Sequence, residues 1–180
     1  MRKIGYYVTK VASRFSKNPR EMMCAYFRRG GAVIGKDCAI SSNLDLCDKQ
    51  MLKIGDNTII SSEVLFVTHD ASITLFGDKT RSLFGKIEIG DNCFIGERAT
   101  IMYGVKLTYN VIVASGSVVT KSFLTPNIII GGNPAKIIGT WSDFETNSHG
   151  KGMLLRETYE AVANDDDERL VKRKEYKEKN

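Results

Sequence analysis

The sequence has little of what metal sites and membrane spans require. It holds only two histidines, His69 and His149, and its four cysteines show neither C-x-x-C spacing nor a cluster with histidine: Cys24, Cys38, Cys47 and Cys93. This scarcity argues against a zinc site and favours reduced, mostly packed thiols. No apolar run approaches the roughly 18–20 residues that cross a bilayer.

The sequence also has only a small excess of positive charge, with a formal net charge of +5 over 180 residues. No basic patch interleaved with aromatic residues is present, so we expect no nucleic-acid partner. The basic N-terminal stretch lacks the continuous apolar segment of a secretory signal. We therefore expect a cytoplasmic protein. A peripheral contact with the inner face of the membrane through residues 1–17 is an additional hypothesis.

A repeat of six residues dominates the sequence. Aliphatic or aromatic residues occupy its positions at Ile34, Ile40, Leu46, Ile54, Ile60, Phe66, Ile89, Ile95, Ile101, Leu107, Val113 and Val119. A period of six fits neither a helix nor a series of hairpins, but it is typical of a triangular coil in which each hexapeptide forms one parallel strand. Glycine and small residues after several of these positions allow tight corners. The predicted fold class is all-β, a left-handed parallel β-helix of hexapeptide repeats.

Counting the repeats in threes divides the chain into coils and flanking segments. The predicted coils cover about 34–51, 54–71, 89–106 and 107–124, with a partial turn to about 139. Each coil contacts only its neighbours, so both ends need a cap. The predicted organisation is an N-terminal helical cap at 1–31, a left-handed β-helix domain at 32–140 with an inserted loop at 72–86, and an extension at 141–180 with a helical tail.

Two helices are predicted before the first coil. Asn18 is a suitable N-cap, Pro19 suits the first helical position, and Gly30 ends the helix. Within residues 1–17 a second pattern places apolar residues at helical spacing among lysines and arginines: Ile4, Tyr7, Val8, Val11 and Phe15. Such a helix either packs on protein, its own prism or a neighbour, or lies on an anionic membrane. The sequence leaves both interpretations open.

The loop at 72–86 interrupts the repeat with Phe76, Leu83 and Phe84. A loop of this length inside a compact repeat is usually functional, and its apolar residues predict packing against another subunit.

His69 is the principal catalytic candidate, because it ends the second coil just before this loop. Imidazole can accept and return a proton near neutral pH, as a general base must. The alternative for His69 is a hydrogen bond to a local carbonyl. His149 lies outside the repeats, in a stretch that resembles a loop, and is assigned no catalytic role.

Three further motifs stand out: Thr68-His69-Asp70 before a loop, Ala114-Ser115-Gly116-Ser117-Val118-Val119-Thr120-Lys121, and Gly132-Asn133-Pro134-Ala135-Lys136. Together with the repeat, they resemble the hexapeptide-repeat acetyltransferase family of acyltransferases, in particular its sugar and polysaccharide O-acetyltransferases. The similarity covers roughly residues 32–140. It implies a homotrimer with the active site between adjacent prisms, acetyl-CoA as co-substrate, no required metal, and His69 as general base.

The resemblance also assigns residues to the two substrates. It places Glu97, Ala114 and Ser115 along the pantetheine arm, and Thr120, Lys121 and Lys136 near the nucleotide end of coenzyme A. Ser41, Asn43 and Asp70 are candidates for the acceptor. The sequence departs from the family pattern where Gly139 replaces a second basic residue, where Phe94 replaces tryptophan and where Tyr103 replaces proline.

The predicted reaction is transfer of an acetyl group to a sugar hydroxyl in cell-surface polysaccharide biosynthesis. An amino sugar or a xenobiotic such as an antibiotic is the alternative acceptor. Two other hypotheses concern the same fold. A zinc enzyme similar to the γ-carbonic anhydrases would need three histidines, and a non-catalytic scaffold would not need His69 beside the lysine motifs.

Overall fold

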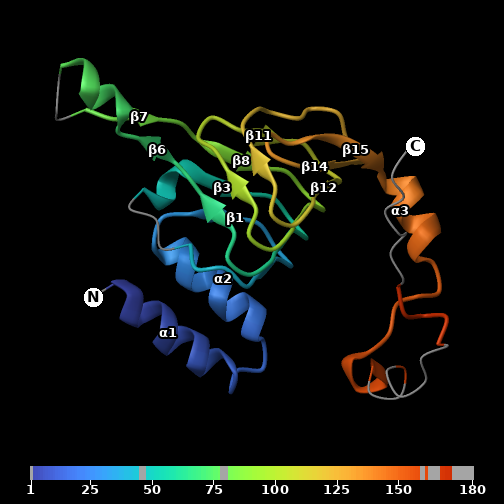
Figure 1. Ribbon diagram of the computed structural model, residues 1–180. Helices are drawn as coiled ribbons and strands as arrows, with labels where there is room; N and C mark the ends of the chain where they lie inside the picture. Colours follow the sequence, from blue (N-terminus) through green and yellow to red (C-terminus); the bar gives the residue numbers. More distant parts are fainter. Residues whose placement is uncertain (1, 45–47, 78–80, 159–160, 162–166, 172–180) are drawn as a thin grey trace, which may run out of the picture. The chain divides into compact units, whose positions relative to one another are not determined.

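The computed structural model describes residues 2–44, 48–77, 81–158, 161 and 167–171 (Figure 1). The chain forms two compact units, Met1–Trp141 and Ser142–Asn180. Leu46 and Cys47 lie outside the described residues.

Three sheets, built mainly from very short parallel strands, form the larger unit (Figure 1). The first sheet contains, in spatial order, β1 (Val33–Ile34), β3 (Leu52–Ile54), β8 (Ile87–Ile89) and β11 (Lys106–Leu107). The second contains β2 (Ala39–Ile40), β4 (Ile59–Ile60), β9 (Phe94–Ile95), β12 (Val111–Val113), β14 (Ile128–Gly131) and β15 (Lys136–Thr140). The third contains β5 (Leu65–Phe66), β10 (Thr100–Ile101) and β13 (Val118–Val119). The chain visits the sheets in turn, so each passage through all three adds one coil.

The residues at the predicted repeat positions form the core between the sheets. Every one that the structure describes is buried: Ile34, Ile40, Ile54, Ile60, Phe66, Ile89, Ile95, Ile101, Leu107, Val113 and Val119. Neighbouring residues within the strands point outward, because side chains alternate between the two faces of a strand. The prediction of parallel hexapeptide strands around one apolar core is therefore confirmed.

One corner of the coil needs backbone conformations that few residues adopt. Asp37, Asn57, Asn92, Asn110 and Asn127 all have a positive φ, between 50° and 59°. Asparagine and aspartate tolerate this region better than most residues. The amides also bond along the corner, with Asn57 Nδ2 2.7 Å from Asn92 Oδ1 and Asn110 Nδ2 2.6 Å from Asn127 Oδ1. These bonds hold successive coils in register.

The C-terminal end of the coil differs from the predicted partial turn. After β14 the chain reverses at Gly132–Ala135, and β15 runs antiparallel to β14, with Ile130 opposite Ile137. An antiparallel return strand covers the last parallel strand, whose free edge could otherwise pair with another chain.

The opposite end is covered by helix α2 (Pro19–Arg29), and the predicted signals are confirmed. The side chain of Asn18 accepts a hydrogen bond from the Glu21 N–H at 3.2 Å, and Gly30 is the C-cap. Met23, Cys24 and Phe27 on α2 join the core of the coil. Helix α1 (Arg2–Ser13) packs against α2.

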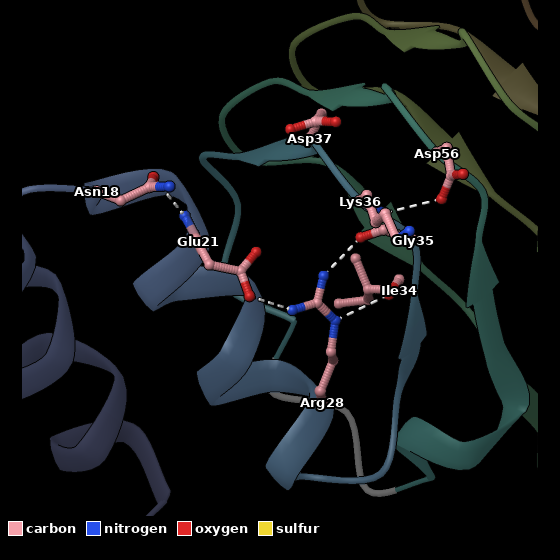
Figure 2. A pocket seen from close by; sticks show the side chains of 8 residues that line it. All are labelled: Asn18, Glu21, Arg28, Ile34, Gly35, Lys36, Asp37 and Asp56. Carbon is pink, nitrogen blue, oxygen red and sulfur yellow. Dashed lines mark hydrogen bonds and ion pairs between the residues drawn. The ribbon is translucent and has the colours of Figure 1, made fainter.

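Several of the residues that line a shallow pocket between α2 and the coil interact with one another through an ion pair and hydrogen bonds (Figure 2). The Arg28 guanidinium donates to the carbonyls of Ile34 at 2.8 Å and Gly35 at 2.5 Å, and it pairs with Glu21 at 2.6 Å. The two carbonyls belong to the first coil whereas Glu21 lies on α2 itself, so Arg28 fastens the cap to the coil through Ile34 and Gly35.

The interruption after the second coil forms an arm. Strand β6 (His69–Asp70) pairs antiparallel with β7 (Leu83–Phe84), and the 3-10 helix η2 (Ser72–Phe76) follows β6. Figure 1 shows β6 and β7 running outward from the coil. Leu75 and Phe76 are 82% and 88% exposed, so these two apolar side chains of the arm are left largely uncovered by the described chain.

The smaller unit contains helix α3 (Trp141–Ser148) from its second residue onward, and the sequence did not predict this helix. The unit also includes the 3-10 helix η3 (Leu155–Glu157). A further 3-10 helix, η1 (Lys49–Met51), precedes β3 in the larger unit. The predicted helical tail, the last third of 141–180, falls mostly on residues 172–180, outside the described residues, and its described part at 167–171 is not helical. No helix in the described part is long and apolar enough to cross a membrane.

Candidate active site

One corner of the coil gathers polar residues from successive coils. The parallel register places Leu65 beside Thr100 and Thr100 beside Val118. Three residues further on, the same alignment brings Thr68, Tyr103 and Lys121 to equivalent corner positions. Asp48 occupies this position in the first coil. It precedes Thr68 by 20 residues, and the paired strand residues Ile34 and Ile54 are separated by the same 20 residues. His69 follows Thr68 at this corner.

A buried carboxylate holds the imidazole of His69. Asp48 Oδ2 lies 3.3 Å from His69 Nδ1 and accepts a hydrogen bond of 2.5 Å from the Thr68 hydroxyl. The Asp48 side chain is 9% exposed, whereas that of His69 is 44% exposed. A carboxylate can only accept hydrogen bonds, so the proton of a neutral imidazole belongs on Nδ1. Nε2 then carries the free lone pair that a general base requires.

The arm fixes the other side of the imidazole. His69 pairs with Phe84 in the β6–β7 ladder, and the two rings lie 5.6 Å apart between centroids. The Gly85 N–H also donates to the Thr68 carbonyl at 3.1 Å. The ring is therefore oriented from two directions, by a carboxylate and by an aromatic face.

Asp70 has a different set of partners. It accepts a hydrogen bond from the Ser72 N–H at 2.7 Å and contacts the Tyr103 hydroxyl at 3.4 Å. The Ser72 N–H is the main reason that the pKa of Asp70 is lowered from its ordinary value. Asp70 thus stays charged at the root of the arm and links it to the next coil through Tyr103.

Five other predicted site residues lie at a second corner. The register that aligns Ile40, Ile60, Ile95, Val113 and Ile130 places Ser41 and Ala114 at equivalent positions. Asn43, Glu97 and Ser115 belong to the same corner, and all three are exposed. This corner precedes the sheet of β5, β10 and β13, whereas His69 follows that sheet. One face of the prism therefore separates the two groups of predicted residues.

The predicted coenzyme lysines also occupy two places. Thr120 and Lys121 are exposed at the corner of His69, two coils further along, and Lys121 Nζ lies 5.7 Å from the centroid of the Phe123 ring. Lys136 is exposed at the start of β15, opposite Gly131. The small residues before Thr120 leave an open surface, because Ser115 and Gly116 are exposed and Gly116 adopts a φ of 70°.

The described cysteines are poorly suited to act as nucleophiles. Cys24, Cys38 and Cys93 are buried and free, and burial raises the pKa of Cys24 and Cys93 to about 11. A thiol held protonated and away from solvent reacts slowly. Among the residues that the structure describes, no three histidines, cysteines or acidic residues converge as a metal site would require. His149 is exposed after α3, in the smaller unit.

Three contributors to the site were not predicted from the sequence: Asp48, Phe84 as the ring neighbour of His69, and Tyr103 as the partner of Asp70. The repeat itself carries a signal for Asp48, because stepping back one coil from Thr68 reaches it. Phe84 and Tyr103 carry no such signal for these contacts, since the pairing of β6 with β7 and the orientation of a corner side chain are tertiary features.

Comparison with known proteins gives related sequences and a related fold. A family model described as the hexapeptide repeat of succinyl-transferase matches residues 86–121. Protein CapG of Staphylococcus aureus is 34% identical over 124 residues, which cover 66% of this chain and 72% of CapG. Galactoside O-acetyltransferase of Escherichia coli (strain K12) is 29% identical over 128 residues, covering 70% of this chain and 63% of that enzyme.

Solved structures resemble the coil itself. The hexapeptide-repeat acetyltransferase VCA0836 from Vibrio cholerae aligns with a TM-score of 0.56 at 20% identity, over 78% of this chain and 90% of that one. Its complex with acetyl coenzyme A aligns with a TM-score of 0.53 at 19% identity, over 78% of this chain and 87% of that one. At this level of identity the likeness concerns the fold.

Proposed function

The chain belongs to the hexapeptide-repeat acetyltransferases, and we propose that it uses acetyl-CoA to acetylate a sugar hydroxyl in cell-surface polysaccharide biosynthesis. The observation that carries this proposal is the contact between His69 Nδ1 and the buried Asp48 carboxylate. A surface histidine with only a local carbonyl partner would have no such constraint. Here the imidazole is half exposed and its second nitrogen is available to an acceptor.

The proposed reaction is direct transfer. His69 Nε2 removes the proton of the acceptor hydroxyl while the hydroxyl oxygen attacks the thioester carbonyl. The C–S bond then breaks, coenzyme A leaves as the thiol with a proton returned from His69, and the acceptor keeps the acetyl ester. Asp48 holds the imidazole in the required tautomer and stabilises the imidazolium that forms. The buried, protonated cysteines support direct transfer over an acyl-enzyme on these thiols.

The chemistry of the exposed residues suits coenzyme A. Lys121 and Lys136 can each meet a phosphate as a point charge. The small side chains of Ala114 and Ser115 allow a thin pantetheine arm to approach the backbone, with Glu97 beside it. Thr120 adds a hydroxyl next to Lys121. No metal takes part in this scheme.

A homotrimer is part of the proposal, because the two groups of candidate residues lie at different corners of one prism. A second copy packed against the arm can place the corner of Ser41, Asn43, Glu97 and Ser115 opposite the corner of His69. The left-handed sense of the coil, the division at residues 31 and 140, and a cytoplasmic location belong to the same proposal.

The acceptor assignment has the support of the E. coli relative, which is named for a galactoside. The test measures acetyl-CoA consumption by release of free thiol in the presence of galactosides, oligosaccharides, amino sugars and chloramphenicol. We expect release that depends on a hydroxylated saccharide, with an ester in the product by mass spectrometry. An amide product would replace the O-acetyl assignment by N-acetylation. Failure to bind acetyl-CoA in calorimetry would contradict the enzyme hypothesis and leave the scaffold.

A further inference from the structure

Helix α1 turns an apolar face away from the rest of the chain. Ile4, Tyr7, Val8 and Val11 follow the i, i+3, i+4, i+7 pattern of one helix face, and they are 66%, 61%, 62% and 58% exposed. Phe15, just beyond the helix, is 88% exposed. A continuous exposed face of this kind marks a contact surface.

The opposite face of α1 already has its partners. Tyr6 is 4% exposed, its ring stacks on Phe27 with 6.1 Å between centroids, and its hydroxyl contacts the Ser41 carbonyl at 3.3 Å. Ser13, one further helical repeat along, is 6% exposed. The packing of α1 on its own chain is therefore achieved without the apolar face. Packing on its own chain, one of the interpretations left open by the sequence, therefore accounts for this face of α1 but not for its apolar face.

The first 20 residues carry charge of one sign only. Six of the 26 basic residues lie there, and the first acidic residue of the chain is Glu21: Arg2, Lys3, Lys10, Arg14, Lys17 and Arg20. The other 160 residues then hold 20 basic against 21 acidic residues, so they are close to neutral. The first 20 residues thus carry a formal charge of +6, which exceeds the net charge of +5 of the whole chain.

We propose that α1 docks on the surface of an anionic lipid bilayer. Lys10 and Arg14 are exposed next to the apolar face, and Lys17 is exposed shortly after it. An amphipathic helix of this composition lies in the interface, with its apolar residues below the headgroups and its cations among them. The other 160 residues of a second copy carry a net charge of only −1 against the +6 of this segment, whereas an anionic bilayer offers negative charge over its whole surface. The charge therefore favours lipid over a subunit contact.

Docking places the coil at the membrane without inserting it. With 12 residues, α1 is far shorter than a span and rests on α2 through Tyr6. Each cation near an anionic surface strengthens binding several-fold, and salt screens this attraction. This inference is independent of the proposed reaction, because the apolar face and the cations that dock are not among the candidate active-site residues.

The experiment is flotation of the full chain with vesicles of phosphatidylcholine, alone or with about one third phosphatidylglycerol. We expect the protein to float with the anionic vesicles, to stay behind with the neutral ones, and to be released by high salt. The double variant Lys10→Ser/Arg14→Ser should lower the partition coefficient roughly 20- to 30-fold. The double variant Val8→Ser/Val11→Ser should abolish flotation.

Matched controls remove the same groups elsewhere. Leu124→Ser/Val171→Ser deletes two apolar side chains that are 65% and 62% exposed, and Lys36→Ser/Lys53→Ser deletes two exposed cations. Both controls should float like the wild type. Equal flotation of all variants, or no flotation of the wild type with anionic vesicles, would overturn the proposal. If the wild type does not float while Val8→Ser/Val11→Ser lowers the molar mass in light scattering, the face is a subunit contact instead.

Discussion

Asp48 Oδ2 lies 3.3 Å from Nδ1 of His69 and 2.5 Å from the hydroxyl of Thr68, so one buried carboxylate ties together two consecutive residues of the next coil. The contact joins residues 21 apart in sequence, and the repeat geometry creates it. Its consequence is a fixed imidazole at a corner that is otherwise exposed.

The first prediction concerns this carboxylate as a positioning group. Asp48→Asn keeps the shape but removes the charge that selects the tautomer, and we expect the turnover number to fall roughly 10²-fold or more. The Michaelis constant for acetyl-CoA should change little, because Asp48 does not lie among the residues proposed for the coenzyme. Steady-state kinetics with the saccharide acceptor measures both quantities.

A double-mutant cycle separates positioning from simple loss of structure. If Asp48 acts through His69, then Asp48→Asn should have almost no further effect on the residual activity of His69→Ala. Additive losses in the double variant would show that Asp48 supports the fold in general. Thr68→Val serves as the milder control, since it removes one donor to Asp48 but leaves the His69 contact.

The second prediction is the effect of removing the base itself. His69→Ala should lower turnover by roughly 10²- to 10⁴-fold, the usual contribution of a positioned general base. The dissociation constant for acetyl-CoA in calorimetry should stay the same, because the imidazole acts on the acceptor proton. His149→Ala, at an exposed position of the smaller unit, is the matched control and should behave as the wild type. Near-full activity of His69→Ala would rule out the proposed mechanism.

The third prediction reverses this pattern for the lysines. Lys121→Ala and Lys136→Ala should each raise the dissociation constant for coenzyme A roughly 3- to 10-fold, because each removes a charge that meets a phosphate. Turnover at saturating acetyl-CoA should change far less. The exposed Lys53 is the control, and Lys53→Ala should leave affinity unchanged.

Dephospho-coenzyme A extends the same experiment. The lysine whose removal affects coenzyme A but not its 3′-dephospho form is the one that meets the 3′-phosphate. If neither substitution weakens either ligand, the coenzyme does not lie along these residues, and the carry-over of the family motif to this chain fails.

Much of the fold could be predicted because its signals are local. The burial of Ile54, Ile60 and Phe66 follows from a strict six-residue step. Helix α2 follows from the side chain of Asn18, the fixed φ of Pro19 and the stop at Gly30. None of these features depends on a distant part of the chain.

The rest depends on contacts that no local pattern contains. The sequence predicts one more strand of the repeat at Lys136–Thr140. This strand instead runs antiparallel to β14, because the chain reverses at Gly132–Ala135. His69 could be selected from the sequence because only two histidines exist. Its carboxylate partner is one of 21 acidic residues, and only the offset of 20 residues between the first two coils, which stacks Asp48 under Thr68, distinguishes it from the others.

The fourth prediction tests the arm as a subunit contact. Leu75 and Phe76 are among the most exposed apolar residues of the chain, at 82% and 88%. Light scattering of the wild type should give about three times the chain mass of 20.1 kDa. Leu75→Ser/Phe76→Ser should shift the mass toward one chain and lower activity, while far-UV circular dichroism stays unchanged because both residues are at the surface. A wild-type mass near 20.1 kDa would contradict the trimer and the site between subunits.

The last prediction uses the buried thiol of Cys93, which is 2% exposed and donates to the Thr108 carbonyl at 3.1 Å. Burial raises its pKa from the ordinary value of 9.0 to about 11. Between these two values the unfolded chain loses the thiol proton while the folded chain keeps it, so the free energy of unfolding falls as the pH rises. The slope is about 1.4 kcal/mol per pH unit for one such proton.

Cys93→Ala lacks this contribution, although the cavity that it leaves lowers stability at every pH. The stability difference between wild type and Cys93→Ala, measured by urea unfolding at one protein concentration, should therefore shrink by about 1 kcal/mol between about pH 8 and pH 10. Val64→Ala is the control, because Val64 is 4% exposed and its side chain does not titrate. The stability lost in this variant should be independent of pH. A deficit of Cys93→Ala that is equally constant would mean that the Cys93 thiol titrates alike in the folded and the unfolded chain, which is incompatible with its burial at the corner of Asn92.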